Sequence, residues 1–189
     1  MKKFTKGFTL IELLIVIALL GALAVALLAA LDPLEQIKKG SDTGTRNTVA
    51  EIHGAMVRYS ALRGGVMPFD TTGGGTQEFV AIGDDAASAQ RKALQSVIDS
   101  GELKSDFTAL AGEQLNKVFI TGINASGNQA VNVCYAPTAK SFRLDVNTKF
   151  IEGDGSVTEA GAGECPSASG TVAGDAANNA GATCYWCVR

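Results

Sequence analysis

Residues 8–31 form a run of 24 residues in which Glu12 has the only ionisable side chain. As an α-helix that rises about 1.5 Å per residue, this run would be roughly 36 Å long. That length is enough to cross a bilayer whose hydrocarbon core is about 30 Å thick, with some tilt. Lys2, Lys3 and Lys6 precede the run, and such positive residues stay on the cytoplasmic side. The sequence therefore predicts one N-terminal membrane-spanning helix, with the rest of the chain on the extracytoplasmic side.

A cleaved secretory signal is the competing interpretation of the same run. The apolar region of such a signal is about 7–15 residues long and ends at small residues. Here the uncharged part, residues 13–31, is 19 residues long, and the small residues near its end form only a weak cleavage site. A spanning helix is therefore favoured.

The residues ahead of the apolar run carry a second signal. Three lysines are followed by Gly7 and then directly by Phe8 and the apolar residues. This arrangement resembles the type IV prepilin signal of type IV pilins and type II secretion pseudopilins. The resemblance implies that residues 1–7 are a leader peptide and that a prepilin peptidase cuts between Gly7 and Phe8. It also implies that Phe8, the new N-terminus, becomes N-methylated.

Glu12 corresponds to the acidic residue of that family, and its place in an apolar run needs a physical reason. A carboxylate within a membrane span costs about 2.5–3.5 kcal/mol on insertion scales. One interpretation is that Glu12, near the start of the helix, reaches the lipid headgroups. The resemblance implies another, in which Glu12 pairs with the new amine on Phe8 of a neighbouring subunit. That pair would offset the desolvation of both charges and set the axial register of a filament.

The rest of the sequence has the size and charge of one ordinary compact domain. The chain has 189 residues and a formal net charge of −3, from 16 basic and 19 acidic residues. Removing the leader with its three lysines leaves 13 basic residues against 19 acidic ones, a side-chain charge of −6. Nucleic-acid interfaces need a basic surface, so this balance does not indicate nucleic-acid binding.

All four cysteines lie in the last third of the chain, at Cys134, Cys165, Cys184 and Cys187. An even number of cysteines beyond a membrane, where conditions are oxidising, predicts disulfides. A zinc site is an alternative, but the only histidine, His53, is far away in sequence. A four-cysteine site would be expected to contain two closely spaced pairs, and only Cys184 and Cys187 form one. A redox pair is another, but such a pair opens a helix, whereas this one ends the chain.

Four cysteines allow three disulfide connectivities, and the local pattern favours one of them. In the alternating run 131–135, Cys134 points away from the face that its valine neighbours share, where it can hold a covering tail. In an extended C-terminus, Cys184 and Cys187 face opposite ways and would have different partners. We therefore expect the pairs Cys165–Cys184 and Cys134–Cys187.

Residues 32–63 are predicted to continue the helix in amphipathic form. Apolar or small residues recur at helical spacing on one face, at Leu34, Ile37, Ser41, Thr45, Val49, Ile52, Met56, Tyr59 and Leu62. Pro33 is either a kink or the first residue of a second helical stretch. Gly40 and Gly44 each lower helix propensity by about 1 kcal/mol, so the helix is expected to fray or bend at 40–48. The glycines and the proline of residues 64–68 end it.

Residues 64–189 are expected to form a globular head. Residues 84–100 predict a short amphipathic helix. Alternating runs then predict strands at 117–123, 130–136 and 141–146, with a fourth short piece at 149–151. Because these strands follow one another at short spacing, an antiparallel meander over about 117–151 is expected.

The end of the chain is predicted to be irregular. Residues 152–183 contain few large apolar residues, so 152–189 is expected to be a C-terminal loop held by disulfides. Tyr185 and Trp186 are expected to pack on the sheet rather than to form a surface contact. The fold class is therefore α+β: a long N-terminal helix, half transmembrane and half amphipathic, packed against a small antiparallel sheet. This is also the architecture of the type IV pilin family that the signal resembles.

The sequence indicates no catalytic site and no cofactor. One histidine on a predicted helix does not assemble a hydrolase triad, and the glycines at 73–75 lack the lysine and the strand of a phosphate loop. Asp154 with Glu152 and Glu159 is a conceivable calcium site, but the spacing fits no known calcium loop. We therefore expect no enzymatic activity and no metal.

The expected function is that of a structural subunit of a type IV pilus-like filament, used for surface attachment, motility or DNA uptake. The resemblance implies, as partners, further copies of the chain, other pilins, the prepilin peptidase and the assembly machinery, with membrane lipid before assembly. It implies a single-pass protein of the cytoplasmic (inner) membrane that later reaches an extracellular pilus or the cell surface. The alternatives are a type II secretion pseudopilin and a membrane-anchored binding module that never polymerises.

Overall fold

The computed structural model divides the chain into two compact units, Met1–Ile37 and Lys38–Arg189. The second is called the globular unit below. The structure describes residues 7–30, 32–69, 80–83, 88–125, 128–153, 156–160, 165 and 184–189. The glycines at 73–75 and Asp154 of the conceivable calcium site lie outside the described residues.

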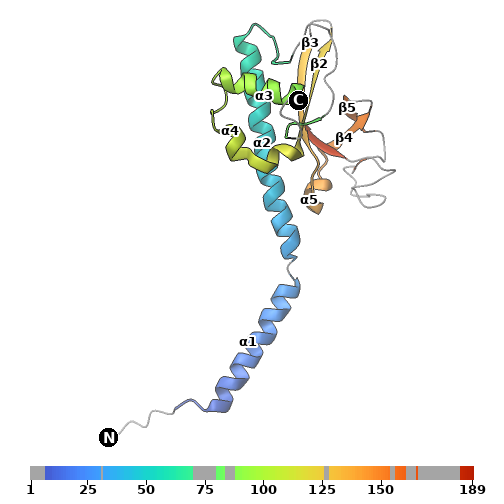
Figure 1. Cartoon of the computed structure of the whole chain (residues 1–189). Coiled ribbons are helices and arrows are strands. Elements are labelled where there is room, and N and C mark those ends of the chain that lie inside the picture. The colour runs from blue at the N-terminus through green and yellow to red at the C-terminus, as the bar shows by residue number, and fades with distance from the viewer. Residues whose placement is uncertain are drawn as a thin grey trace. The chain divides into compact units, whose positions relative to one another are not determined.

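The first unit contains helix α1, Leu10–Ala30, drawn in blue in Figure 1. Its segment Leu10–Ala29 is long and apolar enough to cross a membrane, judged by length and composition. Leu13 and Ile15 are 57% and 51% exposed, and none of the segment is buried within the chain. A helix that is apolar on all sides needs an apolar environment, either lipid or other helices.

Helix α2 spans Pro33–Leu62 and begins with the proline itself. The side chain of Asp32 accepts a hydrogen bond from the backbone N–H of Glu35 at 3.2 Å, which is an N-terminal cap. Proline suits the first helical position because its missing N–H would have no partner there. Pro33 is thus the first residue of a second helix.

Helix α2 continues without interruption through residues 40–48, so the expectation that it frays there was wrong. Asp42 and Thr45 are buried in this segment, 3% and 1% exposed, and they tie it to the globular unit. Contacts of this kind outweigh the low helix propensity of two glycines. The helix ends at Leu62. Gly64 and Gly65 follow, and their positive φ angles allow the Gly65 N–H to reach the Ser60 carbonyl at 2.8 Å.

The sheet is antiparallel throughout, and its strand order is β1-β2-β3-β6-β4-β5. The strands are β1 Val80–Ala81, β2 Val118–Ala125, β3 Asn128–Tyr135, β4 Thr148–Gly153, β5 Ser156–Glu159 and β6 Tyr185–Val188. Strands β2 and β3 match the predicted strands at 117–123 and 130–136. The C-terminal strand β6 lies between β3 and β4, so the predicted meander was wrong about the order of the strands.

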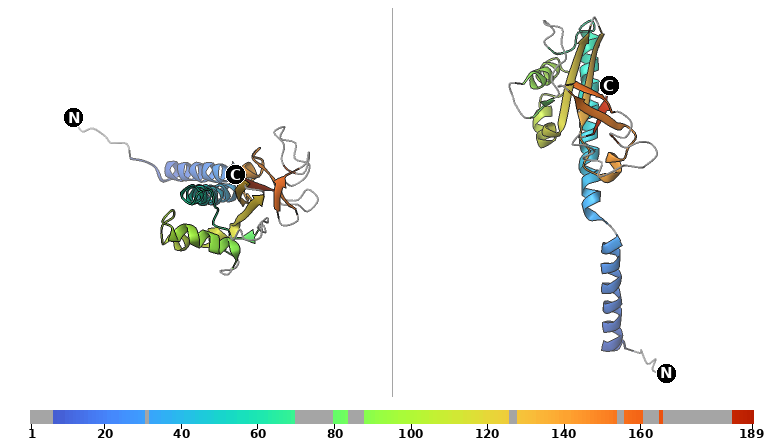
Figure 2. Two further views of the ribbon diagram at one scale, coloured as in Figure 1. Left: turned by 90° about the horizontal axis from the view of Figure 1, so that it is seen from above. Right: turned by 90° about the vertical axis from the view of Figure 1, so that its right-hand side faces the viewer.

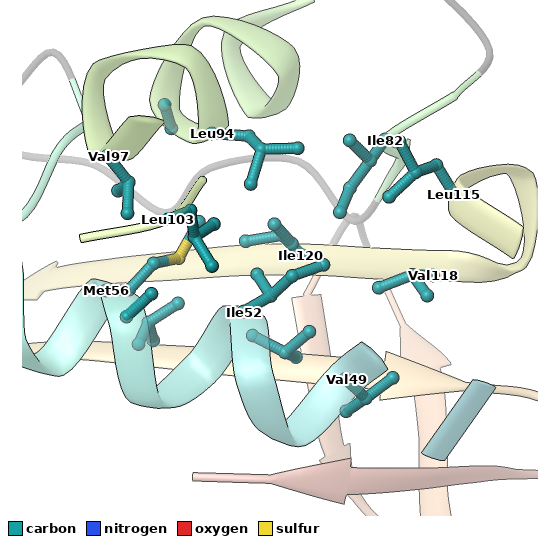
Figure 3. Packing of buried hydrophobic residues seen from close by; sticks show 14 of the residues in the cluster. Val49, Ile52, Met56, Ile82, Leu94, Val97, Leu103, Leu115, Val118 and Ile120 are labelled. Carbon is teal, nitrogen blue, oxygen red and sulfur yellow. The ribbon is translucent and has the colours of Figure 1, made fainter. Parts of the chain in front are cut away.

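The main core lies between α2, helix α3 (Ala89–Asp99) and the sheet. Figure 3 shows Ile52 and Met56 of α2 pointing toward Ile120 of β2, while Leu94 and Val97 of α3 point into the same space. All five side chains are fully buried. The face of α2 that the sequence predicted is therefore buried along this part of the helix. Figure 2 shows the same elements in two further views.

Two short helices, α4 (Phe107–Ala111) and η1 (Gly112–Lys117), lead from α3 into β2. Close packing continues on β2 itself, where Gly122 lies under the ring of Phe69. A Cβ added at Gly122 would lie 2.6 Å from Phe69 Cε2, so no larger residue fits without displacement. Glycine in this strand thus permits a close approach.

The segment 141–146, predicted as a strand, forms helix α5 (Lys140–Arg143) and a turn, so that prediction was wrong. The Ala139 carbonyl accepts hydrogen bonds from the N–H groups of Phe142 and Arg143 and so starts a helical turn. Asp145 Oδ1 then accepts the N–H of Asn147 at 2.9 Å, which closes an Asx-turn. The expected fourth piece at 149–151 is confirmed within β4.

The prediction that 152–189 is wholly a loop was also wrong, because β5 and β6 belong to the sheet. Val157 of β5 and Tyr185 of β6 are 4% and 7% exposed and form a second small core with Phe150. The expectation that Tyr185 and Trp186 pack on the sheet is confirmed. The predicted helix at 84–100 is present as α3, and residues 84–87 lie outside the described part.

Two disulfides connect the C-terminal region to the rest of the globular unit. Cys134 of β3 bonds to Cys187 of β6, directly opposite it in the strand register, and Cys165 bonds to Cys184. These are the two pairs expected from the alternation of the sequence. The first of them fastens the short strand β6 in the middle of the sheet.

Candidate processing and assembly site

The segment that links the leader to α1 is not helical. Residues 7–9 have no regular secondary structure, and the helix begins at Leu10. A Cβ built at Gly7 would meet no atom within 4 Å, and Gly7 has no positive φ. The structure of this chain therefore does not itself require glycine at position 7.

Thr9 and Glu12 form a reciprocal cap at the start of α1. The Thr9 N–H and hydroxyl both donate to Glu12 Oε2, at 2.8 and 2.7 Å. In return the Glu12 N–H approaches Thr9 Oγ1 at 3.4 Å. This is the capping box, in which threonine precedes the helix and glutamate follows three residues later. It satisfies N–H groups that would otherwise be left without partners at a helix start.

Thr9 is a residue that our sequence analysis did not single out. The signal was present, because Thr9-Leu10-Ile11-Glu12 is a T-x-x-E sequence just before an apolar run. The charge of Glu12 is conspicuous in an apolar run, whereas its capping role depends on the residue three positions earlier. The structure brings Thr9 and Glu12 together next to the Gly7–Phe8 bond.

Glu12 is the only ionisable residue of α1, and the two oxygens of its carboxylate differ in their hydrogen bonding. Within the described part of the chain, the hydrogen bonds to the carboxylate all reach Oε2, while Oε1 accepts none. A carboxylate oxygen in apolar surroundings needs a hydrogen-bond donor or a cation. The site can therefore bind one positive group, such as an amine.

A second polar centre lies in the globular unit, on the part of α2 that was expected to fray. The Asp42 carboxylate accepts the N–H groups of Thr138 and Ala139 at 2.8 and 2.7 Å, and the Thr138 hydroxyl at 2.8 Å. One turn along the helix, the Arg46 guanidinium lies 4.2 Å from the ring centroid of Trp186. These contacts hold the segment before α5 and strand β6 against α2.

This polar centre perturbs the pKa of a neighbouring side chain. Burial, reinforced by the negative charge of Asp42, raises the pKa of Tyr135 to about 12, so its hydroxyl stays protonated near neutrality. The ring of Tyr135 lies 5.7 Å from that of Trp186, and the pair packs between the sheet and α2. The centre therefore contributes hydrogen bonds and ring packing within the globular unit.

The structure also describes His53 and Glu159, two further residues considered in the sequence. His53 lies on α2, and burial lowers its pKa. Glu159, from the conceivable calcium site, pairs with Lys149 Nζ at 2.8 Å, and this hydrogen bond lowers its pKa. Among the described residues, no group of three or more His, Cys, Asp or Glu could hold a metal ion.

Comparison with known families adds one finding. Residues 2–28 match a family model described as the prokaryotic N-terminal methylation motif. No curated protein and no solved structure matched the chain. The match spans 27 of 189 residues, so it concerns the N-terminal segment alone.

The chain thus carries a type IV prepilin-like signal, and the motif supports a precursor of the type IV pilin or pseudopilin kind. It marks structural proteins rather than enzymes, and it implies processing by a prepilin peptidase and assembly into filaments. The α+β fold, with a long apolar N-terminal helix and a small antiparallel sheet, is consistent with that class. The apolar helix fits a membrane-anchored protein that is later assembled outside the cell.

Proposed function

We propose that the protein is a structural subunit of a type IV pilus-like filament that serves surface attachment, motility or DNA uptake. The prepilin peptidase removes residues 1–7 by cutting between Gly7 and Phe8, and Phe8 is then N-methylated. The subunit waits in the cytoplasmic (inner) membrane and then polymerises with further copies and other pilins. Its partners are the assembly machinery and, before assembly, membrane lipid.

The proposal rests mainly on the exposed apolar helix α1, which overlaps the match to the methylation motif. This helix exposes leucine and isoleucine side chains all round, and each such side chain is worth about 1.5–3 kcal/mol when moved out of water. Lipid supplies that apolar environment in the membrane, and packed helices of other copies supply it in a filament. Gly21 and the many alanines of α1 favour close helix packing.

Glu12 supplies the specificity that apolar packing lacks. An unpaired carboxylate at this depth costs about 2.5–3.5 kcal/mol, so a subunit docks best where the carboxylate finds a cation. Cleavage before Phe8 creates one such cation, the new amine. We infer that Glu12 of one subunit pairs with the Phe8 amine of its neighbour and so fixes a one-subunit axial step.

The globular unit suits the extracellular part of such a filament. Its two disulfides persist in an oxidising environment and hold a C-terminal strand that the rest of the sheet depends on. Its acidic side-chain balance gives no basic surface for nucleic acid. DNA uptake would therefore involve this subunit through the filament rather than through direct binding.

The proposal is tested by expressing variants in a strain that lacks the native gene and by examining the sheared surface fraction by electron microscopy. Gly7→Val should leave an uncut precursor in the membrane and no filaments, and open space around Gly7 makes misfolding a poor explanation. Glu12→Ala should be cut but assemble poorly. Glu51→Ala, which removes an exposed acid of α2, is the matched control and should assemble normally.

The alternatives give different outcomes in the same strains. A pseudopilin would form only short assemblies, and its loss would abolish secretion of folded proteins while leaving attachment and motility intact. A membrane-anchored binding module would leave Gly7–Phe8 uncut and would function normally with Glu12→Ala. Either result would contradict the proposed pilus role.

A further inference from the structure

The capping box leaves the carboxylate of Glu12 with one fixed oxygen and one open oxygen. Oε2 accepts both the N–H and the hydroxyl of Thr9, at 2.8 and 2.7 Å. In the part of the chain that the structure describes, Oε1 has no hydrogen-bond donor. A glutamate elsewhere on an exposed helix turns freely about its side-chain bonds, whereas this one is held by two donors on one side.

We propose that Thr9 is a positioning residue for filament assembly: it holds Glu12 so that Oε1 faces the amine of an incoming copy of the chain. This inference rests on the proposed function, because the amine exists only after cleavage before Phe8. Thr9 itself need not touch the neighbouring subunit. It acts through Glu12.

Two physical effects favour this arrangement. A long side chain loses rotamer freedom when it forms an ion pair, and a side chain already fixed by Thr9 has less to lose at that step. In addition, a carboxylate leaves water at a high cost, and two hydrogen bonds from Thr9 satisfy one of its oxygens before the partner arrives. The ion pair with the amine then completes a carboxylate that is already half satisfied.

A purely structural role for Thr9, that of starting α1 at Leu10, makes a different prediction. Glutamine at the third helical position keeps a capping box, because its amide oxygen also accepts the N–H of the capping residue. Glu12→Gln therefore removes the charge but keeps the cap. If Thr9 only caps the helix, replacing it should cost the same with glutamate or glutamine at position 12. If it acts through the carboxylate, the two effects should not add.

The experiment is a competition between subunits in one cell. Wild-type chain and one variant are co-expressed, and mass spectrometry gives their ratio in sheared filaments divided by their ratio in the membrane pool. Thr9→Ser keeps the hydroxyl and should be incorporated at parity. Thr9→Val keeps the shape but loses the hydroxyl, and it should be depleted at least about tenfold, the ratio that corresponds to losing one hydrogen bond to a charged group.

The glutamine background decides between the two roles. Glu12→Gln should be depleted more strongly than Thr9→Val, and the double variant should be depleted no further than Glu12→Gln alone. Parity of Thr9→Val with wild type, or an equal added loss in the glutamine background, would overturn the inference. So would a Thr9→Val precursor that stays uncut in the membrane pool, since that would place Thr9 in recognition by the peptidase.

The same strains separate this inference from the proposed function. If wild-type chain forms filaments and Thr9→Val enters them at parity, the filament role stands and the positioning role falls. If wild-type chain is never cut or never reaches filaments, both fall together.

Discussion

Asp42 is the buried acid whose removal should damage the globular unit most. Asp42 is only 3% exposed, and its carboxylate accepts three hydrogen bonds from Thr138 and Ala139. Hydrogen bonds to a charged group contribute about 1.5–3 kcal/mol each, and the fully buried Ala139 N–H would keep no partner after Asp42→Ala. Part of that loss is offset because no carboxylate has to be buried any longer. We therefore expect Asp42→Ala to lower the free energy of unfolding by about 3–4 kcal/mol.

Asp42→Asn is the informative companion variant. Oδ2 accepts both N–H groups, whereas Oδ1 accepts only the Thr138 hydroxyl. An asparagine can place its oxygen at the Oδ2 position and donate from its nitrogen to the same hydroxyl, which is able to accept. All three hydrogen bonds survive in a weaker, uncharged form. Asp42→Asn should therefore cost about 1–2 kcal/mol, clearly less than alanine.

The assay is urea unfolding of the full chain in mild detergent, followed by tryptophan fluorescence. Trp186 is the only tryptophan, and it lies in β6 next to Arg46, so its signal reports on the globular unit. Glu51→Ala, an exposed acid on the same helix, should change the free energy of unfolding by no more than about 0.5 kcal/mol. A cost below about 1 kcal/mol for Asp42→Ala, or equal costs for alanine and asparagine, would refute the hydrogen-bond reasoning.

Four further variants can be measured by the same unfolding assay. Gly122→Ala should destabilise by about 1–3 kcal/mol, because its Cβ meets an aromatic ring, whereas Gly40→Ala on an open helical surface should stabilise by up to about 1 kcal/mol. Replacing Cys134 and Cys187 together by serine should cost about 4 kcal/mol, since that disulfide spans 53 residues. Burial lowers the pKa of His53 below 6.5, so stability should fall as pH drops below that value, and His53→Gln should flatten this pH dependence.

The elements that sequence reasoning predicted are those governed by a single strong pattern. An apolar run with one charge admits only a helix in an apolar environment, and α1 follows. Regular spacing of Val49, Ile52 and Met56 specifies the buried face of α2, and simple alternation specifies β2 and β3. In each of these elements, the local pattern and the tertiary packing agree.

The elements that it missed depend on contacts between distant segments. The run 141–146 alternates like a strand, but the chain before it is held by Asp42, 96 residues away from Thr138, and a helical turn starts there instead. Strand β6 has only four residues, and its place between β3 and β4 depends on partners that no local pattern names. A buried acid in a glycine-containing helix segment carries no signal of its own, so Asp42 could not be found from spacing.

The candidate site was predicted only in part, because sequence reasoning finds conspicuous residue types more readily than contacts. Gly7, Phe8 and Glu12 stand out because a glycine, an aromatic residue and a lone acid are conspicuous around an apolar run. Thr9 does not stand out by residue type. The T-x-x-E pattern that it begins is a sequence signal for a capping box, and the hydrogen bonds with Glu12 show that the box forms.

The most direct test of the central claim is the intact mass and N-terminal sequence of this protein sheared from the native cell surface. Our account predicts a chain that begins at N-methylated Phe8 and is about 4 Da lighter than the reduced chain, because two disulfides remove four hydrogens. A chain that begins at Met1 and is found only in the membrane fraction would contradict the account and would favour a non-polymerising membrane anchor.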